Sequence, residues 1–112
     1  MSVGERDCVF CQIIRGERPA DFVFQDESVV VFKDIRPSAP IHLLVVPRQH
    51  IRSLNDLEDR DRGIVSEMIF RAKEVARGLG ISQSGYKLLF NVEWGGGQLI
   101  FHLHMHLFGG WR

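Results

Sequence analysis

The chain has 112 residues, of which 14 are basic, 14 are acidic and 45% are hydrophobic. That length and apolar content suit one small domain spanning residues 1–112. Because the charges cancel, no broad positive field is available to hold a nucleic-acid polymer or an anionic membrane surface. The N-terminal residues are polar and no apolar run reaches membrane-spanning length, so we expect no membrane partner and a cytoplasmic location.

The first half of the chain predicts one short helix and three strands. Apolar residues recur at helical spacing over residues 9–15, and Gly16 ends that pattern. Three β-rich runs follow at residues 21–24, 28–32 and 41–46, separated by short polar or proline-bounded links.

The second half predicts one long helix and a hairpin. Apolar residues keep a helical period over residues 56–78, and β-like runs follow at 86–92 and 98–108, joined by the glycines at 95–97. Strands with short links pair antiparallel. We therefore expect an α+β fold with a mainly antiparallel five-stranded sheet, one short N-terminal helix and one long helix.

Three histidines alternate with apolar residues near the C-terminus. On a strand, His102, His104 and His106 would share one face, and the residues between them would face the core. Three imidazoles on one face are a poor structural choice, because they pack badly and repel each other when protonated. A metal site and a phosphate site both fit, since imidazole ligates zinc and imidazolium donates hydrogen bonds to anions.

The two cysteines, Cys8 and Cys11, are too close in sequence to stabilise the fold effectively as a disulfide. A redox pair is the weaker interpretation, because such a pair usually follows a strand in a βαβ unit. Two thiolates at this spacing form half of a tetrahedral zinc site, and reduced buried thiols are the plain alternative.

Residues 102–108 (HLHMHLF) resemble the histidine triad (HIT) signature, in which three histidines alternate with apolar residues. The resemblance covers nearly the whole chain and follows the family's order. Within the family it is most similar to the phosphoramidase (Hint) and bacterial-type nucleotide hydrolase branch with an N-terminal Cys-x-x-Cys. The other matching segments are residues 8–14 (CVFCQII), 32–37 (FKDIRP), 40–47 (PIHLLVVP), 50–51 (HI) and 96–98 (GGQ).

The resemblance implies cleavage at the α-phosphate of purine nucleoside phosphoramidates, for example AMP linked to an amine, through a covalent nucleotidyl-histidine. It places the nucleophile at His104, with His106 and His42 on the phosphate side. A neutral imidazole is a good nucleophile near its ordinary pKa, and neighbouring imidazoles can protonate the leaving group without a catalytic metal. By its position alone, His42 could equally be an inward, hydrogen-bonded residue of a buried strand.

The resemblance also implies substrate contacts. Asp34 matches the carboxylate that binds the ribose hydroxyls, Asn91 matches a phosphate-contacting asparagine, and Gly97 and Gln98 could present backbone N–H groups to an anion. By pattern alone, Asp34 could be a turn residue and the glycines a plain turn. The resemblance also implies apolar walls around the base, formed by Val9, Phe10, Ile13, Phe32 and Ile35. By periodicity alone, these five residues could be ordinary core.

The resemblance assigns the two other histidines, His50 and His102, to a structural zinc together with Cys8 and Cys11. Such a metal would tie the N-terminal segment to the sheet and leave no open position for catalysis. A homodimer is likewise implied by the resemblance, with a purine nucleotide as the small-molecule partner.

Two features depart from the Hint pattern. Leu99 stands where a phosphate-contacting serine is common, and the chain ends after Gly110 with two residues instead of a longer tail, so the leaving-group preference is expected to differ. Three alternatives therefore stay open: a dinucleoside polyphosphate hydrolase, a hydrolase whose histidines hold a catalytic zinc, and a nucleotide-binding module without turnover.

Overall fold

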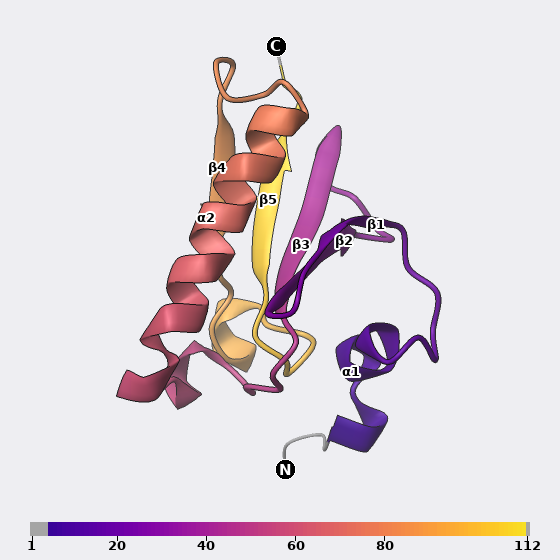
Figure 1. Cartoon of the computed structure of the whole chain (residues 1–112), viewed down its shortest axis with the longest axis vertical. Coiled ribbons are helices and arrows are strands. Elements are labelled where there is room, and N and C mark those ends of the chain that lie inside the picture. Colours follow the sequence, from indigo (N-terminus) through magenta and orange to yellow (C-terminus); the bar gives the residue numbers. More distant parts are fainter. Residues whose placement is uncertain (1–4, 112) are drawn as a thin grey trace.

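The computed structural model describes residues 5–111; the expectations for the first four residues and for Arg112 lie outside this range. One antiparallel sheet of five strands forms the centre of the molecule, in the order β1-β2-β3-β5-β4 (Figure 1). The strands are β1 Phe22–Gln25, β2 Val29–Lys33, β3 Ile41–Pro47, β4 Tyr86–Leu89 and β5 Met105–Gly109. The helices are α1 Val9–Ile14 and α2 Arg62–Gly78, with short 3-10 turns η1 Glu5–Asp7, η2 Leu54–Asp56, η3 Asp59–Asp61 and η4 Trp94–Gly96.

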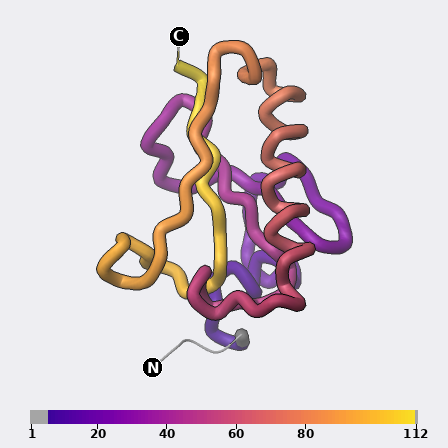
Figure 2. The backbone as a smooth tube through the Cα atoms, turned by 90° about the vertical axis from the view of Figure 1, so that its left-hand side faces the viewer, coloured from indigo at the N-terminus to yellow at the C-terminus, as the bar shows by residue number. Residues whose placement is uncertain are grey.

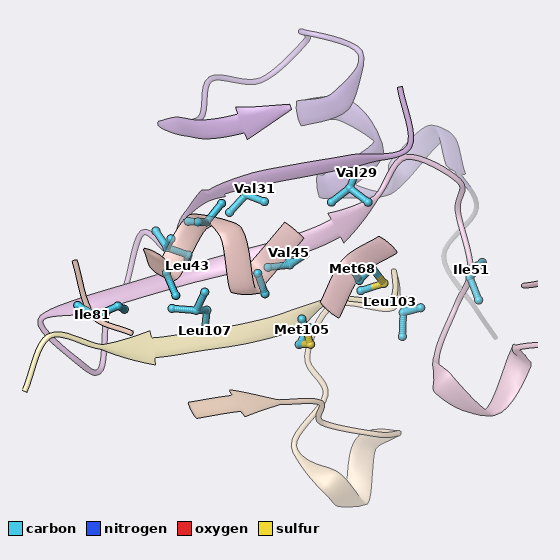
Figure 3. Close-up of a cluster of buried hydrophobic side chains, with 13 residues drawn as sticks. Val29, Val31, Leu43, Val45, Ile51, Met68, Ile81, Leu103, Met105 and Leu107 are labelled. Atoms are coloured by element: carbon cyan, nitrogen blue, oxygen red, sulfur yellow. The ribbon is translucent and has the colours of Figure 1, made fainter. Parts of the chain in front are cut away.

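The long helix α2 covers one face of the sheet. Met68, Ala72, Val75 and Ala76 recur at helical spacing and form its buried stripe. They pack against alternate residues of the three central strands, because successive side chains of a strand point to opposite faces (Figure 3). The strand residues of this core are Val29, Val31, Leu43, Val45, Met105 and Leu107.

The short helix α1 packs on the opposite face. Its buried residues Phe10 and Ile13 join a second cluster with the intervening strand residues Val30, Phe32, Leu44 and Val46. Six residues are too few for a helix that is stable by itself, so α1 depends on this packing. Because both faces are covered, β2 and β3 are apolar on both sides.

The predicted α+β fold, the five-stranded antiparallel sheet and the two helices are confirmed. The largest differences from the predicted boundaries are at α2, β4 and β5. The long helix begins at Arg62 instead of Asp56, because η2 and η3 take up the first residues and the side chain of Asp61 accepts from the backbone N–H of Glu58. The strands β4 and β5 are shorter than predicted, and the glycines form the turn η4 within a long connection. Within residues 5–111, no helix is long and apolar enough to cross a membrane.

Candidate active site and metal centre

A cleft of about 430 Å³ opens on the α1 side of the sheet. It lies between α1, the loop that follows β2 and the connection from β4 to β5. Figure 2 shows both of these loops on the side of the strands away from α2. The triad histidines His104 and His106 line this cleft, which makes it the candidate active site.

The imidazole of His104 is held in one tautomer by the backbone. Its Nδ1 lies 2.7 Å from the carbonyl oxygen of His102, and a carbonyl can only accept a hydrogen bond. Nδ1 therefore carries the proton and Nε2 keeps its lone pair. The ring is 8% exposed and meets Phe10 edge to face, with ring centroids 5.0 Å apart. This is the state that a nucleophilic imidazole requires.

His42 and His106 form a directional hydrogen-bond chain. The backbone N–H of Ser38 donates to His42 Nδ1 at 3.1 Å, so the proton of a neutral His42 is on Nε2. That proton points at His106 Nδ1, 2.9 Å away. The proton of a neutral His106 is then on Nε2. The Asn91 Nδ2 atom lies 3.3 Å from this nitrogen, and a half-turn of the side-chain amide places its oxygen there as the acceptor. These hydrogen bonds thus direct the Nε2–H group of His106 into the cleft.

Burial keeps all three imidazoles neutral near pH 7. It lowers the pKa of His106 to about 4, with the neighbouring His104 and His42 adding to the shift. Burial likewise lowers the pKa of His42 and of His104, against the opposing effect of the Asp34 carboxylate. The Asp34 carboxylate lies 3.4 Å from His42 Nε2 and accepts a hydrogen bond from the backbone N–H of Arg36.

A second cluster, next to the cleft, consists of Cys8, Cys11, His50 and His102. Their ligand atoms all lie within 4.8 Å of one another. His102 Nε2 donates to the carbonyl oxygen of Pro47 at 2.8 Å, which leaves Nδ1 free as a ligand. That Nδ1 lies 3.4 Å from Cys8 Sγ and 3.5 Å from Cys11 Sγ, and His50 Nδ1 lies 3.2 Å from Cys11 Sγ.

These four side chains fit a tetrahedral zinc. Zinc bonds of about 2.3 Å to sulfur and 2.0 Å to nitrogen place such ligands about 3.5 Å apart, close to the distances found here. Both cysteines are buried, and no disulfide joins them. Such a site is closed, because four protein ligands leave no position for a substrate, and it would fasten α1 to the chain around His50 and His102.

Another group of possible ligands, Asp34, His42 and His106, is less suited to a metal. For His42 to bind a metal through Nε2, its Nδ1 would have to carry the proton. Nδ1 instead accepts from the backbone N–H of Ser38, which cannot rotate away. The tautomers therefore favour proton transfer in this cluster and metal binding at the cysteines.

The predicted substrate contacts converge on the cleft, with one exception. Asp34, Asn91 and Gly97 line it, as do the five apolar residues Val9, Phe10, Ile13, Phe32 and Ile35. Gln98 does not: its side chain is 2% exposed and bonds to backbone groups of the surrounding loops. The backbone N–H groups of Gly97 and Gln98 already donate to carbonyls within the turn.

Several residues of the site were missed by sequence reasoning. The backbone groups of Ser38 and Pro47 fix two tautomers, and a backbone partner has no signature in the sequence. Leu44 and Ile100 add to the apolar lining, beside Leu99, which the sequence had already singled out and which is 74% exposed there. The position of Leu44, two residues after His42 on β3, was the available signal, since both share a face.

A family model described as "Scavenger mRNA decapping enzyme C-term binding" matches residues 7–110. The purine nucleoside phosphoramidase of Escherichia coli (strain K12) is 41% identical over 104 residues, which are 93% of this chain and 87% of that protein. The chain belongs to the histidine triad family. The resemblance of residues 102–108 to the family's signature is thereby confirmed.

Solved histidine triad structures share the fold. A HIT family hydrolase from Legionella pneumophila Philadelphia 1 is 47% identical, covers 95% of each chain and has a TM-score of 0.93. A zinc-bound histidine triad family protein from Mycobacterium smegmatis is 31% identical, with a TM-score of 0.84 over 97% of this chain and 78% of that one. A relative of this fold therefore holds zinc.

Proposed function

We propose that the protein cleaves purine nucleoside phosphoramidates at the α-phosphate, through a covalent nucleotidyl intermediate on His104. The tautomer of His104 carries the proposal: its Nδ1–H donates to the carbonyl of His102, so the nucleophilic Nε2 is the nitrogen left for the substrate. The phosphoramidase of E. coli, at 41% identity, supports this choice of substrate class.

The cleft can accommodate a nucleotide with its parts in a defined order. The base packs between the apolar walls around Phe10 and Phe32, and the ribose hydroxyls donate to Asp34 at the rim. The α-phosphate then lies between His104 and His106, with the Asn91 amide as a further hydrogen-bond donor. An anionic phosphate favours protonated imidazole, so binding raises the low pKa of His106 and the His42–His106 pair gains one proton.

In the first step, the Nε2 lone pair of His104 forms a bond to phosphorus. The phosphorus–nitrogen bond of the substrate breaks, and its electron pair stays on the leaving amine. The proton on His106 Nε2 passes to that amine, which departs neutral. His104 now carries the nucleotidyl group, and its Nδ1–H bond to the His102 carbonyl stabilises the positive ring.

In the second step, a water oxygen forms a bond to phosphorus and the bond to His104 Nε2 breaks. The electron pair returns to His104, and the proton of the water passes to His106, which acts here as a base. The nucleoside monophosphate leaves, and both histidines are restored. No metal ion takes part in either step, and a structural zinc at Cys8, Cys11, His50 and His102 would serve only the fold.

The experiment is a search for the covalent intermediate. The protein is mixed with an adenosine phosphoramidate and quenched without acid, because phosphohistidine is acid-labile, and its intact mass is measured. We expect one added nucleotidyl mass in the wild type, none in His104→Asn, and normal adduct in the exposed control Asp59→Asn. Absence of both adduct and turnover in the wild type would contradict the proposal.

The side chain at position 99 bears on the leaving group of the substrate. Leu99 presents an apolar side chain where a serine is common in the Hint branch, so a phosphate contact is replaced by apolar surface. A panel of nucleotidyl amides and dinucleoside polyphosphates, assayed side by side, separates phosphoramidase from dinucleoside polyphosphate hydrolase. We expect the amides to give the higher kcat/KM.

We extend the proposal to a homodimer, as the resemblance implies. The edge strand β4 exposes Leu88 and Leu89, two apolar side chains that a second copy could cover. Light scattering after gel filtration is expected to give twice the chain mass. The cytoplasmic location stays a prediction from the sequence.

A further inference from the structure

The connection between β4 and β5 contains an unusual backbone conformation at Glu93. Its φ is 65° and its ψ is 172°, and within residues 5–111 it is the one non-glycine residue with positive φ. This region of conformational space is adopted almost only by glycine. A glutamate there costs free energy, so the surrounding structure must hold it in place.

The carboxylate of Glu93 is held by the segment that follows His50. The guanidinium of Arg52 donates to Oε1 at 3.0 and 2.6 Å and to Oε2 at 2.7 Å. The hydroxyl of Ser53, which is fully buried, donates to Oε2 at 2.5 Å. Charge-assisted bonds of this forked kind fix geometry as well as distance.

The backbone of Glu93 is held from the other side. Its N–H donates to Gln98 Oε1 at 2.9 Å, and its carbonyl accepts from the N–H groups of Gly96 and Gln98. The Gln98 amide in turn donates to the carbonyl of Arg52 at 2.9 Å. The buried Gln98 thus links the two segments that Arg52 and Glu93 join at the surface.

This loop carries two residues of the cleft. Asn91 lies two positions before Glu93 and contacts His106 Nε2, while Gly97 closes the turn that begins at Glu93. The carboxamide oxygen of Asn91 lies 3.6 Å from the place that a Cβ on Gly97 would occupy, so the two positions lie close together. The opposite segment is fixed to the triad, because Leu103 N–H donates to the carbonyl of Ile51 at 2.6 Å.

We propose that Arg52 and Glu93 are a positioning pair, which holds the 91–97 loop so that the Asn91 amide meets the phosphate and His106. Neither residue lines the cleft. Their pairing keeps Glu93 in its strained conformation, and that conformation sets the direction in which the chain leaves Asn91. The catalytic consequence rests on the proposed function, whereas the effect on Asn91 does not.

The test separates strain from positioning at one residue. Glu93→Ala removes the carboxylate but leaves a side chain at the unfavourable backbone conformation. Glu93→Gly removes the carboxylate and also relieves the backbone strain. We expect Glu93→Ala to lower the melting temperature and Glu93→Gly to recover it, because glycine adopts this φ freely. We expect kcat for an adenosine phosphoramidate to fall by about 10- to 100-fold in both variants, with a smaller change in KM, since a small misplacement at a reacting centre is enough for such a loss.

Further variants test the pairing itself. Glu93→Gln retains an acceptor for Arg52 and Ser53 and is expected to recover part of kcat. Arg52→Ala combined with Glu93→Ala should lose less kcat than the two single losses multiplied together, because the Arg52–Glu93 interaction is removed in all three variants. The control Asp59→Asn, which breaks an exposed pair with Arg62, is expected to leave kcat unchanged. Additive losses in the double variant would overturn the pairing.

Two measurements distinguish failure of this inference from failure of the proposed function. AMP affinity by calorimetry and the side-chain amide signal of Asn91 by NMR need no turnover. Weaker AMP binding and a shifted Asn91 signal in Arg52→Ala support the pair even if wild-type protein hydrolyses none of the substrates tested. Recovery of both stability and kcat in Glu93→Gly, or an unmoved Asn91 signal in Arg52→Ala, would overturn it.

Discussion

At the scale of single residues, the proton on His106 is the group whose role can be tested most directly. In His106→Gln the side chain keeps hydrogen-bonding capacity but cannot transfer a proton. We expect kcat/KM for an alkylamine-leaving substrate to fall by about 10²- to 10⁴-fold, the usual contribution of a general acid. For a nitrophenyl ester of AMP, whose leaving group needs no proton, the loss should be much smaller.

Comparing the two substrates in the same variant measures this difference. Equal losses on both would show that His106 holds the phosphate without donating a proton. The His42 hydrogen bond to His106 Nδ1 makes donation from Nε2 the expected outcome.

The sequence predicted which residues meet in the site better than it predicted their states. The alternation of residues 102–106 and the resemblance to the histidine triad signature predicted His104 and His106 as catalytic residues. Which nitrogen of each ring carries the proton depends on the carbonyl of His102 and the N–H of Ser38. Backbone partners of this kind follow from the fold and not from the identity of the residue that provides them.

At the scale of elements, α1 is the part whose attachment depends on the metal ligands. Cys8 is its N-cap and Cys11 lies in its first turn, while Phe10 and Ile13 form a wall of the cleft. Cys11→Ser is expected to abolish zinc binding, lower the melting temperature by about 4 °C or more, and raise KM more than it lowers kcat.

Metal analysis, melting curves and hydrogen exchange over residues 9–14 check this prediction, and wild-type protein treated with a chelator should behave like the variant. Loss of kcat on chelation, with α1 still protected from exchange, would instead indicate a catalytic metal.

The boundaries of α2 and β5 show where the hydrophobic pattern of the sequence does and does not predict the structure. The helical period predicted α2 well from Arg62 onward, because a helix covering a sheet must present an apolar stripe. Alternation at residues 98–104 predicted a strand that is not formed. Alternation reports which side of the chain is buried, and here Gln98 and His102 reach across to residues 47–52 without a neighbouring strand to pair with.

At the scale of the whole molecule, the buried histidines make stability depend on pH. The pKa of His106 is about 4 in the folded protein and near 6.5 in an unfolded chain. Between these values the unfolded state binds a proton that the folded state does not, so the free energy of unfolding falls as pH falls from 6.5 to 4 and this contribution then levels off.

Urea unfolding at several pH values, on wild-type protein and His106→Gln at matched metal content, measures that contribution. The variant is expected to lose less stability over this interval. Parallel curves for the two proteins would show that His106 is protonated to the same extent in both states.

The topology was only partly predictable. Strand number and antiparallel pairing followed from the short links, but the insertion of β5 between β3 and β4 did not. That insertion pairs Leu44 with His106, and places His42 and His106 on neighbouring strands at hydrogen-bond distance. Histidines 64 positions apart become neighbours only through this strand order.

Alternate residues of the central strands β3 and β5 face opposite sides of the sheet. Odd-numbered positions such as Leu43 and Met105 face α2, whereas the even-numbered His42 and His106 belong to the reacting side. One backbone therefore meets two requirements on opposite faces, cohesion on one and chemistry on the other. A substitution that keeps the volume of the layer beneath α2 can leave the catalytic layer in place, and a substitution in the cleft lining can change substrate preference without rebuilding the scaffold.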